Sequence, residues 1–311
     1  MPDPSTDTEV QTAELGPKQI RKIIDRFRVT DGADFKLKHY ATDDPLPDIV
    51  DKSQAKALLR QGVQRLSDLQ ELLYANASWS LLIVFQAMDA AGKDGTIKHV
   101  MSGVNPQGIL VTSFKAPGPE DLAHDFLWRI NRALPARGMI GIFNRSHYEE
   151  VLVTRVHPEI LARQGLPPSL TDGKKFWDHR LKDIAGFERH LARQGTIVLK
   201  FFLNVGRDEQ KKRFLERLDH PDKNWKFDIG DLKERGYWTD YMAAYEEAIA
   251  ATATEQAPWF IVPADQKWFM RLVVVAAIND ALEALALKTV MPTDEQIASF
   301  AEARRRLEQE P

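Results

Sequence analysis

Short apolar runs alternate along this chain with longer segments in which apolar residues recur at helical spacing. Five runs have the length of buried strands: Leu81–Phe85, Ile109–Phe114, Gly138–Phe143, Thr196–Val205 and Trp259–Val262. The longest helical segments are Ile49–Tyr74, Glu120–Leu134 and Lys174–Arg193. Strands that alternate with helices indicate right-handed crossovers and parallel pairing. We therefore expect an α/β fold, with a doubly wound parallel five-stranded sheet flanked by helices.

The two ends of the chain depart from this pattern. Residues 1–16 carry proline, serine, threonine and acids without periodicity, which predicts a disordered N-terminal tail. We expect residues 17–290 to form a single domain and residues 291–311 to form a C-terminal helix.

Composition narrows the classes of function. The chain has 311 residues and no cysteine, which excludes disulfides, thiolate catalysis and cysteine metal sites. Its net charge of −3 gives no overall attraction for a polyanion, so any phosphate group must be met by local basic clusters. No apolar run approaches the length of a membrane span, and the N-terminus has no apolar signal core. We expect a cytoplasmic enzyme with neither a membrane nor a nucleic acid as partner.

The stretch Leu81–Thr96, LLIVFQAMDAAGKDGT, carries the clearest chemistry. A buried strand, a loop of small residues, a lysine and a helix follow one another, which is the arrangement of a phosphate-binding P-loop. The candidate phosphate-binding residues are the lysine and its neighbours, Ala91, Gly92, Lys93, Asp94 and Gly95. The alternative is an ordinary strand-to-helix turn that carries a surface lysine.

This loop differs from the pattern G-x-x-x-x-G-K-[ST] at two positions. Ala87 stands in the first glycine slot, and alanine is strained wherever φ must be positive, so we expect a turn of different shape. Asp94 stands where a serine or threonine hydroxyl would bind Mg²⁺. A second acid, Asp89, lies inside the loop, and its carboxylate is the candidate metal ligand.

The segment FNRSHYEE directly follows the third predicted strand. Ligands of open α/β sheets bind beyond the carboxyl ends of the strands, so this segment and the P-loop belong to one cleft. Asn144 can orient a metal-bound water or a phosphoryl oxygen. Arg145 can donate hydrogen bonds to two phosphate oxygens at once, and Glu149 can reach a nucleotide or the metal. His147 and Tyr148 are expected to serve local packing and hydrogen bonding.

A third concentration of charge follows the fourth predicted strand, over about residues 207–236. Asp208 should cap a helix that runs to about Leu218, and Arg213 and Arg217 lie four apart on one face of it. One interpretation is a basic lid that closes over phosphates and excludes water. Because acids are interleaved throughout, the alternative is a solvated face of surface ion pairs.

Five stretches together resemble polyphosphate kinase family 2: GKDGTIKHVMSGVNPQG, VTSFKAP, FNRSHYEEVLVTRVHP, KNWKFDIGDLKER and APWFIVPAD. The resemblance runs from about Arg26 to Leu287 in matching order, and NRSHYEEVLV is most similar to the third class. It implies a P-loop kinase fold with a helical lid and Mg²⁺ or Mn²⁺ as cofactor. It also implies reversible, in-line phosphoryl transfer between inorganic polyphosphate and nucleotides. The third class accepts AMP as well as ADP, so AMP, ADP and ATP are the implied nucleotides.

The resemblance also assigns roles. An acid at position 94 is similar to what the family shows. The implied catalytic residues are Asp89, Lys93, Asn144 and Arg145, with Asp89 as the metal ligand. The implied lid residues are Arg213 and Arg217, which would bind polyphosphate. On the chemistry of their side chains, Arg145 and Glu149 are the candidate nucleotide-binding residues. We also expect a homo-oligomer.

Two other classes of function remain open from the sequence. An ATP-dependent nucleotide kinase on the same fold would place a serine or threonine at Asp94 and a glycine at Ala87, and neither is present. A non-catalytic module that binds polyphosphate or nucleic acid would use the basic segment, but it would not need Asp89 and Asn144 at two converging strand ends.

Overall fold

A six-stranded sheet forms the centre of the molecule, and its strand order is β1-β6-β5-β2-β4-β3. The computed structural model describes residues 15–171 and 173–310. The five parallel strands are β2 (Ser80–Gln86), β3 (Ile109–Ser113), β4 (Ile140–Asn144), β5 (Thr196–Asn204) and β6 (Trp259–Pro263). The predicted parallel five-stranded arrangement is therefore confirmed.

One strand of the sheet was absent from the sequence-based prediction. The strand β1 (Arg28–Val29) pairs antiparallel with β6 and adds a sixth strand at that edge. Two residues are too few for an alternating pattern to appear, so periodicity gives no signal for this strand.

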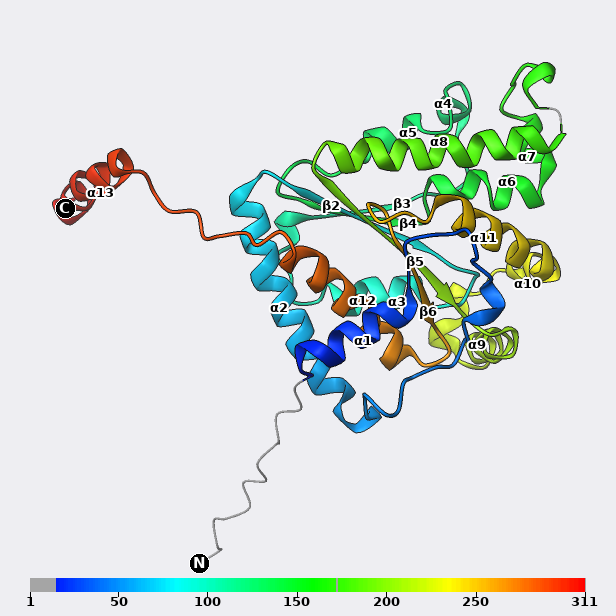
Figure 1. The fold of residues 1–311 in the computed structure, drawn as a ribbon, viewed down its shortest axis with the longest axis horizontal. Coiled ribbons are helices and arrows are strands. Elements are labelled where there is room, and N and C mark those ends of the chain that lie inside the picture. The colour runs from blue at the N-terminus through cyan, green and yellow to red at the C-terminus, as the bar shows by residue number, and fades with distance from the viewer. Residues whose placement is uncertain (1–14, 172, 311) are drawn as a thin grey trace, which may run out of the picture.

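Helices cover both faces of the sheet (Figure 1). On one face, α12 (Lys267–Glu283) packs against α1 (Pro17–Phe27), α2 (Ala55–Asn76) and α3 (Lys93–Val100). On the other face, α11 (Trp238–Thr252) packs against α6 (Val153–Val156) and α8 (Gly173–Arg193). The strands β2, β4, β5 and β6 are largely buried, as expected for parallel strands covered on both sides, whereas the edge strand β3 is partly exposed, with Leu110 at 45% and Val111 at 49% exposure.

Two predicted helices have different boundaries. The helix expected over Ile49–Tyr74 begins only at Ala55, after a short 3-10 turn, η2 (Lys52–Gln54). The helix expected over Glu120–Leu134 is two helices, α4 (Pro119–Leu122) and α5 (Trp128–Arg132). Between them the carboxylate of Asp125 accepts a hydrogen bond from the backbone N–H of Leu127 at 2.9 Å, so a side-chain turn replaces helical bonding there.

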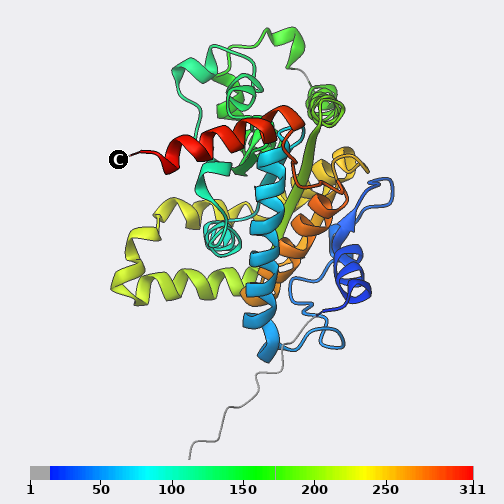
Figure 2. The same ribbon diagram turned by 90° about the vertical axis from the view of Figure 1, so that its left-hand side faces the viewer.

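The segment after β5 leaves the body of the molecule and returns to it (Figure 2). It contains α9 (Arg207–Asp219), the 3-10 helix η6 (Pro221–Lys226) and α10 (Ile229–Gly236). The N-cap of α9 is Gly206, whose N–H is bonded to Asp265 Oδ1 at 2.7 Å, whereas Asp208 lies in the first turn. The prediction that Asp208 caps this helix is therefore wrong.

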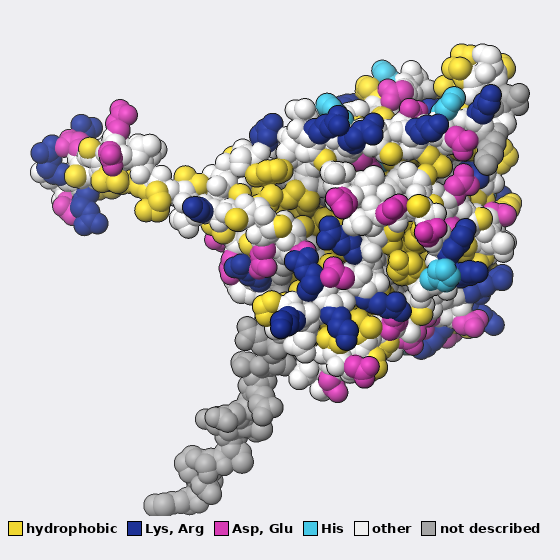
Figure 3. All heavy atoms as spheres, viewed as in Figure 1, with side chains coloured by type: hydrophobic (Ala, Val, Ile, Leu, Met, Phe, Trp, Pro, Cys, Tyr) yellow, Lys and Arg dark blue, Asp and Glu magenta, His cyan; other side chains and the backbone are white. Residues whose placement is uncertain are grey.

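The chain ends lie outside the layered body. Residues 1–14 of the expected N-terminal tail are outside the described residues, and Gly16 caps α1. At the other end, α13 (Asp294–Glu308) stands away from the body on an extended stalk (Figure 1). Apolar side chains are visible on that stalk, and basic and acidic side chains are interspersed over the visible face (Figure 3). Within residues 15–171 and 173–310, every helix is too short or too polar to span a lipid bilayer.

The remaining helical turns are short. They are α7 (Pro158–Ala162) and the 3-10 helices η1 (Leu37–His39), η3 (Pro106–Gly108), η4 (His147–Glu150) and η5 (Pro168–Leu170). Of these, η4 directly follows β4 and carries part of the candidate active site.

Candidate active site

The loop between β2 and α3 begins at the carboxyl end of the central parallel strand. Its left-handed residues are Ala90, at φ +60°, and Gly92, at φ +110°. Ala87 is not among the residues with positive φ in the described part of the chain. The strained backbone expected at Ala87 is therefore found at Ala90, three positions later. For an alanine, the left-handed conformation is less stable than the right-handed one by roughly 1–2 kcal/mol.

Lys93 is the first residue of α3 and its side chain folds back over this loop. The Nζ atom donates to the carbonyl of Ala87 at 2.9 Å. Burial lowers the pKa of Lys93, and the neighbouring carboxylate of Asp89 opposes that shift. The ammonium therefore sits at the loop mouth, where a phosphate would meet a poorly solvated positive charge.

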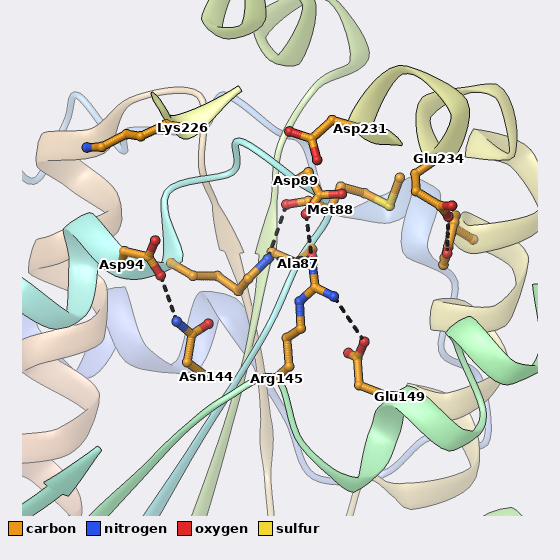
Figure 4. Close-up of polar contacts among 12 residues, drawn as sticks. Ala87, Met88, Asp89, Asp94, Asn144, Arg145, Glu149, Lys226, Asp231 and Glu234 are labelled. Carbon is orange, nitrogen blue, oxygen red and sulfur yellow. Dashed lines mark hydrogen bonds and ion pairs between the residues drawn. The ribbon is translucent and has the colours of Figure 1, made fainter. Parts of the chain in front are cut away.

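Arg145 lies between two carboxylates (Figure 4). Its Nη2 atom is 3.0 Å from Asp89 Oδ1, and its Nη1 atom is 3.7 Å from Glu149 Oε2. These neighbours, Glu149 first, raise the pKa of Arg145, so the guanidinium stays charged. Burial raises the pKa of Glu149, and Arg145 opposes that shift. The P-loop and the segment after β4 are thus joined by an ion-pair chain.

Asn144 forms a second link between the same two segments. Its Nδ2 atom donates to Asp94 Oδ1 at 2.6 Å, which connects the end of β4 to the first turn of α3 (Figure 4). Asp94 also places a negative charge at a helix N-terminus, where it is favourable. The structure therefore brings together all four residues that the sequence assigns to catalysis, Asp89, Lys93, Asn144 and Arg145.

Arg213 on α9 is 4% exposed and holds the P-loop from behind. Its Nη1 atom donates to the carbonyls of Ala90 and Ala91, at 3.1 and 2.8 Å. Its Nη2 atom donates to the carbonyls of Ala264 and Asp265, and its Nε atom to Glu209. A guanidinium has five N–H groups, so all of them have protein acceptors. Arg213 therefore supports the left-handed Ala90, although its charge still faces the cleft.

Arg217, one turn further along α9, is less constrained. Its Nη1 atom donates to the carbonyl of Lys226 at 3.0 Å and to Asp231 Oδ2 at 3.3 Å. Its Nε and Nη2 atoms have no hydrogen-bond partner among the described residues. This arginine keeps donors with which it can bind an anion.

Several residues of the site carry no signal in the P-loop pattern. Gln210 donates to the carbonyl of Asp89 at 2.9 Å and accepts from Arg235 of α10 at 2.7 Å, so α9 and α10 are linked to the loop through this amide. Lys267 and Arg271 of α12 face the same cleft. Their spacing of four residues at the start of a helix is the sequence signal that could have identified them.

Two cavities meet at this site. The larger, of about 690 Å³, is lined by the P-loop, Asn144 and basic side chains of α3, α9, η6 and α12: Lys93, Arg213, Arg217, Lys223, Lys226, Lys267 and Arg271. The smaller, of about 150 Å³, is lined by residues that include Glu149, Phe126 and Gln164. Lys115, Ala116 and Arg145 line both cavities. The two spaces therefore adjoin at Arg145.

His147 and Tyr148 are buried beneath this junction, at 2% and 0% exposure. The ring of His147 contacts Glu188 of α8 through Nε2 at 3.2 Å, and the hydroxyl of Tyr148 donates to Glu188 at 2.7 Å. The structure thus places both side chains in packing and hydrogen bonding, as the sequence suggested.

The chemistry of the cleft suits a hard divalent cation held jointly with a substrate. Among the described residues there is no cluster of three or more acidic or histidine side chains placed to hold a metal. Mg²⁺ is usually bound by one or two carboxylates together with substrate phosphates and water, so it needs no such cluster. Asp89 and Asp94 both line the larger cavity and supply that kind of donor.

A buried parallel strand, a phosphate loop, a lysine at the start of the next helix and a basic cavity above them define a P-loop phosphotransferase. Within that class, the chain belongs to the polyphosphate kinase 2 family. The sequence model described as Polyphosphate kinase 2 (PPK2) matches residues 49–289.

Named relatives agree with this assignment. The chain is 49% identical over 283 residues to the ADP-polyphosphate phosphotransferase of Rhodopseudomonas palustris, covering 91% of this chain and 97% of that protein. It is 45% identical over 267 residues to the AMP/ADP-polyphosphate phosphotransferase of Meiothermus ruber, covering 86% and 96%. The crystal structure of polyphosphate kinase 2 from Arthrobacter aurescens superposes with a TM-score of 0.79 and 41% identity, covering 88% of this chain and 95% of that one.

Proposed function

We propose that this protein transfers a phosphoryl group from inorganic polyphosphate to ADP, to AMP or to both. The observation that carries the proposal is the meeting of a large basic cavity and a smaller cavity at Arg145, beside Lys93. A polyphosphate chain needs a long positively charged surface, whereas a nucleotide needs a compact pocket with a few polar groups. The names of the relatives from Rhodopseudomonas palustris and Meiothermus ruber support these substrates.

In this proposal the terminal polyphosphate group lies over the P-loop, held by the N–H groups of residues 92–95 and by Lys93. The terminal phosphate of the nucleotide lies at the cavity junction, where Arg145 contacts both reacting groups. It is already an anion, so the attack needs no strong general base. Positioning and charge stabilisation then provide most of the rate, and the same arrangement serves the reverse reaction.

Mg²⁺ or Mn²⁺ is the proposed cofactor, and when bound it neutralises charge on the phosphoryl oxygens. Asp89 is its proposed ligand, because one carboxylate oxygen pairs with Arg145 and leaves the other available. Asp94 is bonded to Asn144, which makes it the less available carboxylate.

We propose that Glu149 accepts a hydrogen bond from the nucleotide in the smaller cavity, which it lines together with Arg145. In the larger cavity, Arg217 and the lysines of the lid contact the polyphosphate chain, and Arg213 contributes its charge from behind the loop. We also propose that the reaction takes place in the cytoplasm and that the enzyme is a homo-oligomer.

Incubation of the protein with polyphosphate, Mg²⁺ and either ADP or AMP, without ATP, tests the proposal. We expect ATP from ADP, and ADP followed by ATP from AMP. A parallel incubation with EDTA should stop the reaction. Retention of polyphosphate without turnover would instead favour the binding-module alternative, and transfer that needs ATP as the phosphoryl donor would favour an ordinary nucleotide kinase.

A further inference from the structure

A buried ion pair lies directly beneath the segment that carries Arg145 and Glu149. Lys200 of β5 and Glu188 of α8 are 0% and 1% exposed, and their Nζ and Oε2 atoms are 2.5 Å apart. The Lys200 ammonium also donates to the carbonyl of Thr252 at 2.8 Å and to the hydroxyl of Tyr148 at 3.2 Å. All three of its N–H groups therefore have acceptors.

A pair of charged side chains is unusual at the centre of a parallel sheet. Lys200 is flanked across the sheet by Val84 and Trp259, both of them buried. A buried ion pair is weak evidence of stabilisation, because well-packed apolar residues of similar size often serve as well or better. Burial lowers the pKa of Lys200, and Glu188 opposes that shift. Stability alone does not account for the pair.

The remaining carboxylate oxygen of Glu188 faces the active-site segment. Its Oε1 atom contacts both Tyr148 Oη, at 2.7 Å, and His147 Nε2, at 3.2 Å. These two residues lie between Arg145 and Glu149 in the chain. The ion pair thus reaches both ligand-facing residues through consecutive side chains.

The backbone of that segment needs support. Arg145 has φ +63°, a left-handed conformation that is strained for a residue with a side chain, and such strain persists where the surroundings fix it. From the sheet side, its N–H donates to the carbonyl of Phe85 at 3.1 Å, and Ser146 Oγ accepts from Gln86 at 3.0 Å. From the core side, the contacts are those that Glu188 makes with His147 and Tyr148.

We propose that Lys200 and Glu188 are positioning residues for the nucleotide side of the active site, acting through Tyr148 and His147 on Arg145 and Glu149. The inference rests on the proposed function for the identity of the ligand. In this proposal an ion pair that does not touch the reacting groups fixes the geometry at the junction of the two cavities.

Three variants separate positioning from packing. Lys200→Met/Glu188→Leu replaces the pair with apolar side chains, so no unpaired charge stays buried. Lys200→Met/Glu188→Gln keeps an amide that can still accept from Tyr148. Leu66→Ala removes a buried side chain from α2, on the opposite face of the sheet, and is the control for general loss of core packing.

We expect the Met/Leu variant to raise the KM for ADP between about ten- and a hundredfold, because small displacements of binding groups have effects of that size. The KM for polyphosphate should change much less, since that chain is bound mainly by the lid and the P-loop. The Met/Gln variant should recover part of the loss. Leu66→Ala should leave both KM values unchanged at temperatures well below its Tm.

Hydrogen exchange provides a readout that does not depend on activity. The amides of Arg145 and Tyr148 should exchange faster in the Met/Leu variant than in the unaltered chain, and Tyr148→Phe should give an intermediate rate. Unchanged exchange at these amides, or an unchanged KM for ADP with a normal Tm, would overturn the proposal. Failure of the unaltered chain to transfer phosphate would refute the proposed function instead, and the exchange rates would still decide the positioning role.

Discussion

Arg213 and Arg217 lie one turn apart on α9, yet they bind the protein in different ways. All five N–H groups of Arg213 have acceptors on the P-loop, on the residues after β6 and on α9. Arg217 uses only Nη1, toward Lys226 and Asp231. The first arginine therefore shapes the loop, and the second has donors for a phosphate chain.

This difference predicts that substitution of the two arginines will have different effects. Arg213→Lys should lower both Tm and kcat, because it leaves buried loop carbonyls without donors at a cost of about 1–3 kcal/mol each. Arg217→Ala should lower Tm less than Arg213→Lys, because its pair with Asp231 is only partly buried, at 22% and 19% exposure, but it should raise the KM for polyphosphate severalfold. Thermal unfolding and steady-state kinetics with varied polyphosphate distinguish the two. Equal increases of that KM would show that both arginines bind the chain.

Salt provides a second measurement on the same surface. If the polyphosphate chain lies along exposed basic groups, its KM should rise with ionic strength, and the slope should be smaller in Arg217→Ala. A KM that is independent of salt would contradict binding along the lid.

Lys93 should be essential for transfer without being essential for folding. Lys93→Ala removes the charge at the loop mouth and should lower kcat by about 10²–10³. The matched control is Lys98→Ala, an exposed lysine on the same helix that does not line either cavity. Near-normal turnover of the Lys93 variant, with normal Tm, would show that Lys93 and its loop do not take part in phosphoryl transfer.

The two acids of the loop should differ in metal dependence. Asp89→Asn should raise the Mg²⁺ concentration required for half-maximal rate by at least roughly tenfold, because it removes the proposed ligand. Asp94→Asn should change it less, since that carboxylate is bonded to Asn144. Rates measured against Mg²⁺ concentration decide between them, and equal shifts would mean that the ligand is assigned wrongly.

Glu149 should make stability depend on pH. Because burial raises its pKa above the usual value of about 4.3, the folded state binds more protons than the unfolded state between these two values. By linkage, the free energy of unfolding falls as pH rises through that interval. In the Glu149→Gln variant the free energy of unfolding does not fall in this way, because glutamine does not ionise. Its Tm should therefore exceed that of the unaltered chain at neutral pH, and the difference should vanish on acidification. Calorimetry over the acidic and neutral range measures it. A difference that does not depend on pH would contradict the raised pKa.

Removal of the C-terminal helix should spare catalysis. No hydrogen bond or ion pair joins α13 to the other described residues, and its own polar contacts are internal. A chain ending at residue 289 should therefore keep its kcat and Tm. Light scattering on both chains tests the expected homo-oligomer, and a smaller assembly after truncation would show that α13 joins subunits.

The elements that periodicity could predict are those with long, regular patterns. The five parallel strands and the meeting of Lys93 with Arg145 follow from the sequence, because parallel strands end at the same edge of the sheet. The strand β1 and the break near Asp125 depend on two-residue pairing and on one side-chain hydrogen bond, which leave no periodic signal.

Partnerships between distant residues were the part that the sequence could not supply. It placed Arg213 on a lid helix but not against the carbonyl of Ala91, which is 122 positions away. Lys200 is the exception, because a lysine inside the apolar run TIVLKFFLN is itself a signal of a buried partner. The identity of that partner, Glu188, still needed the packing of α8 on β5.

The stalk that carries α13 leads away from both α9 and α10 (Figure 1). The last hydrogen bond between the body and the described part of this stalk runs from Asn76 to the carbonyl of Lys288, at 2.9 Å. A group attached to the chain beyond that point would lie away from the cleft. The C-terminus is therefore the end at which a resin, or a second enzyme that consumes ATP, can be attached so that nucleotide is recycled where it is used.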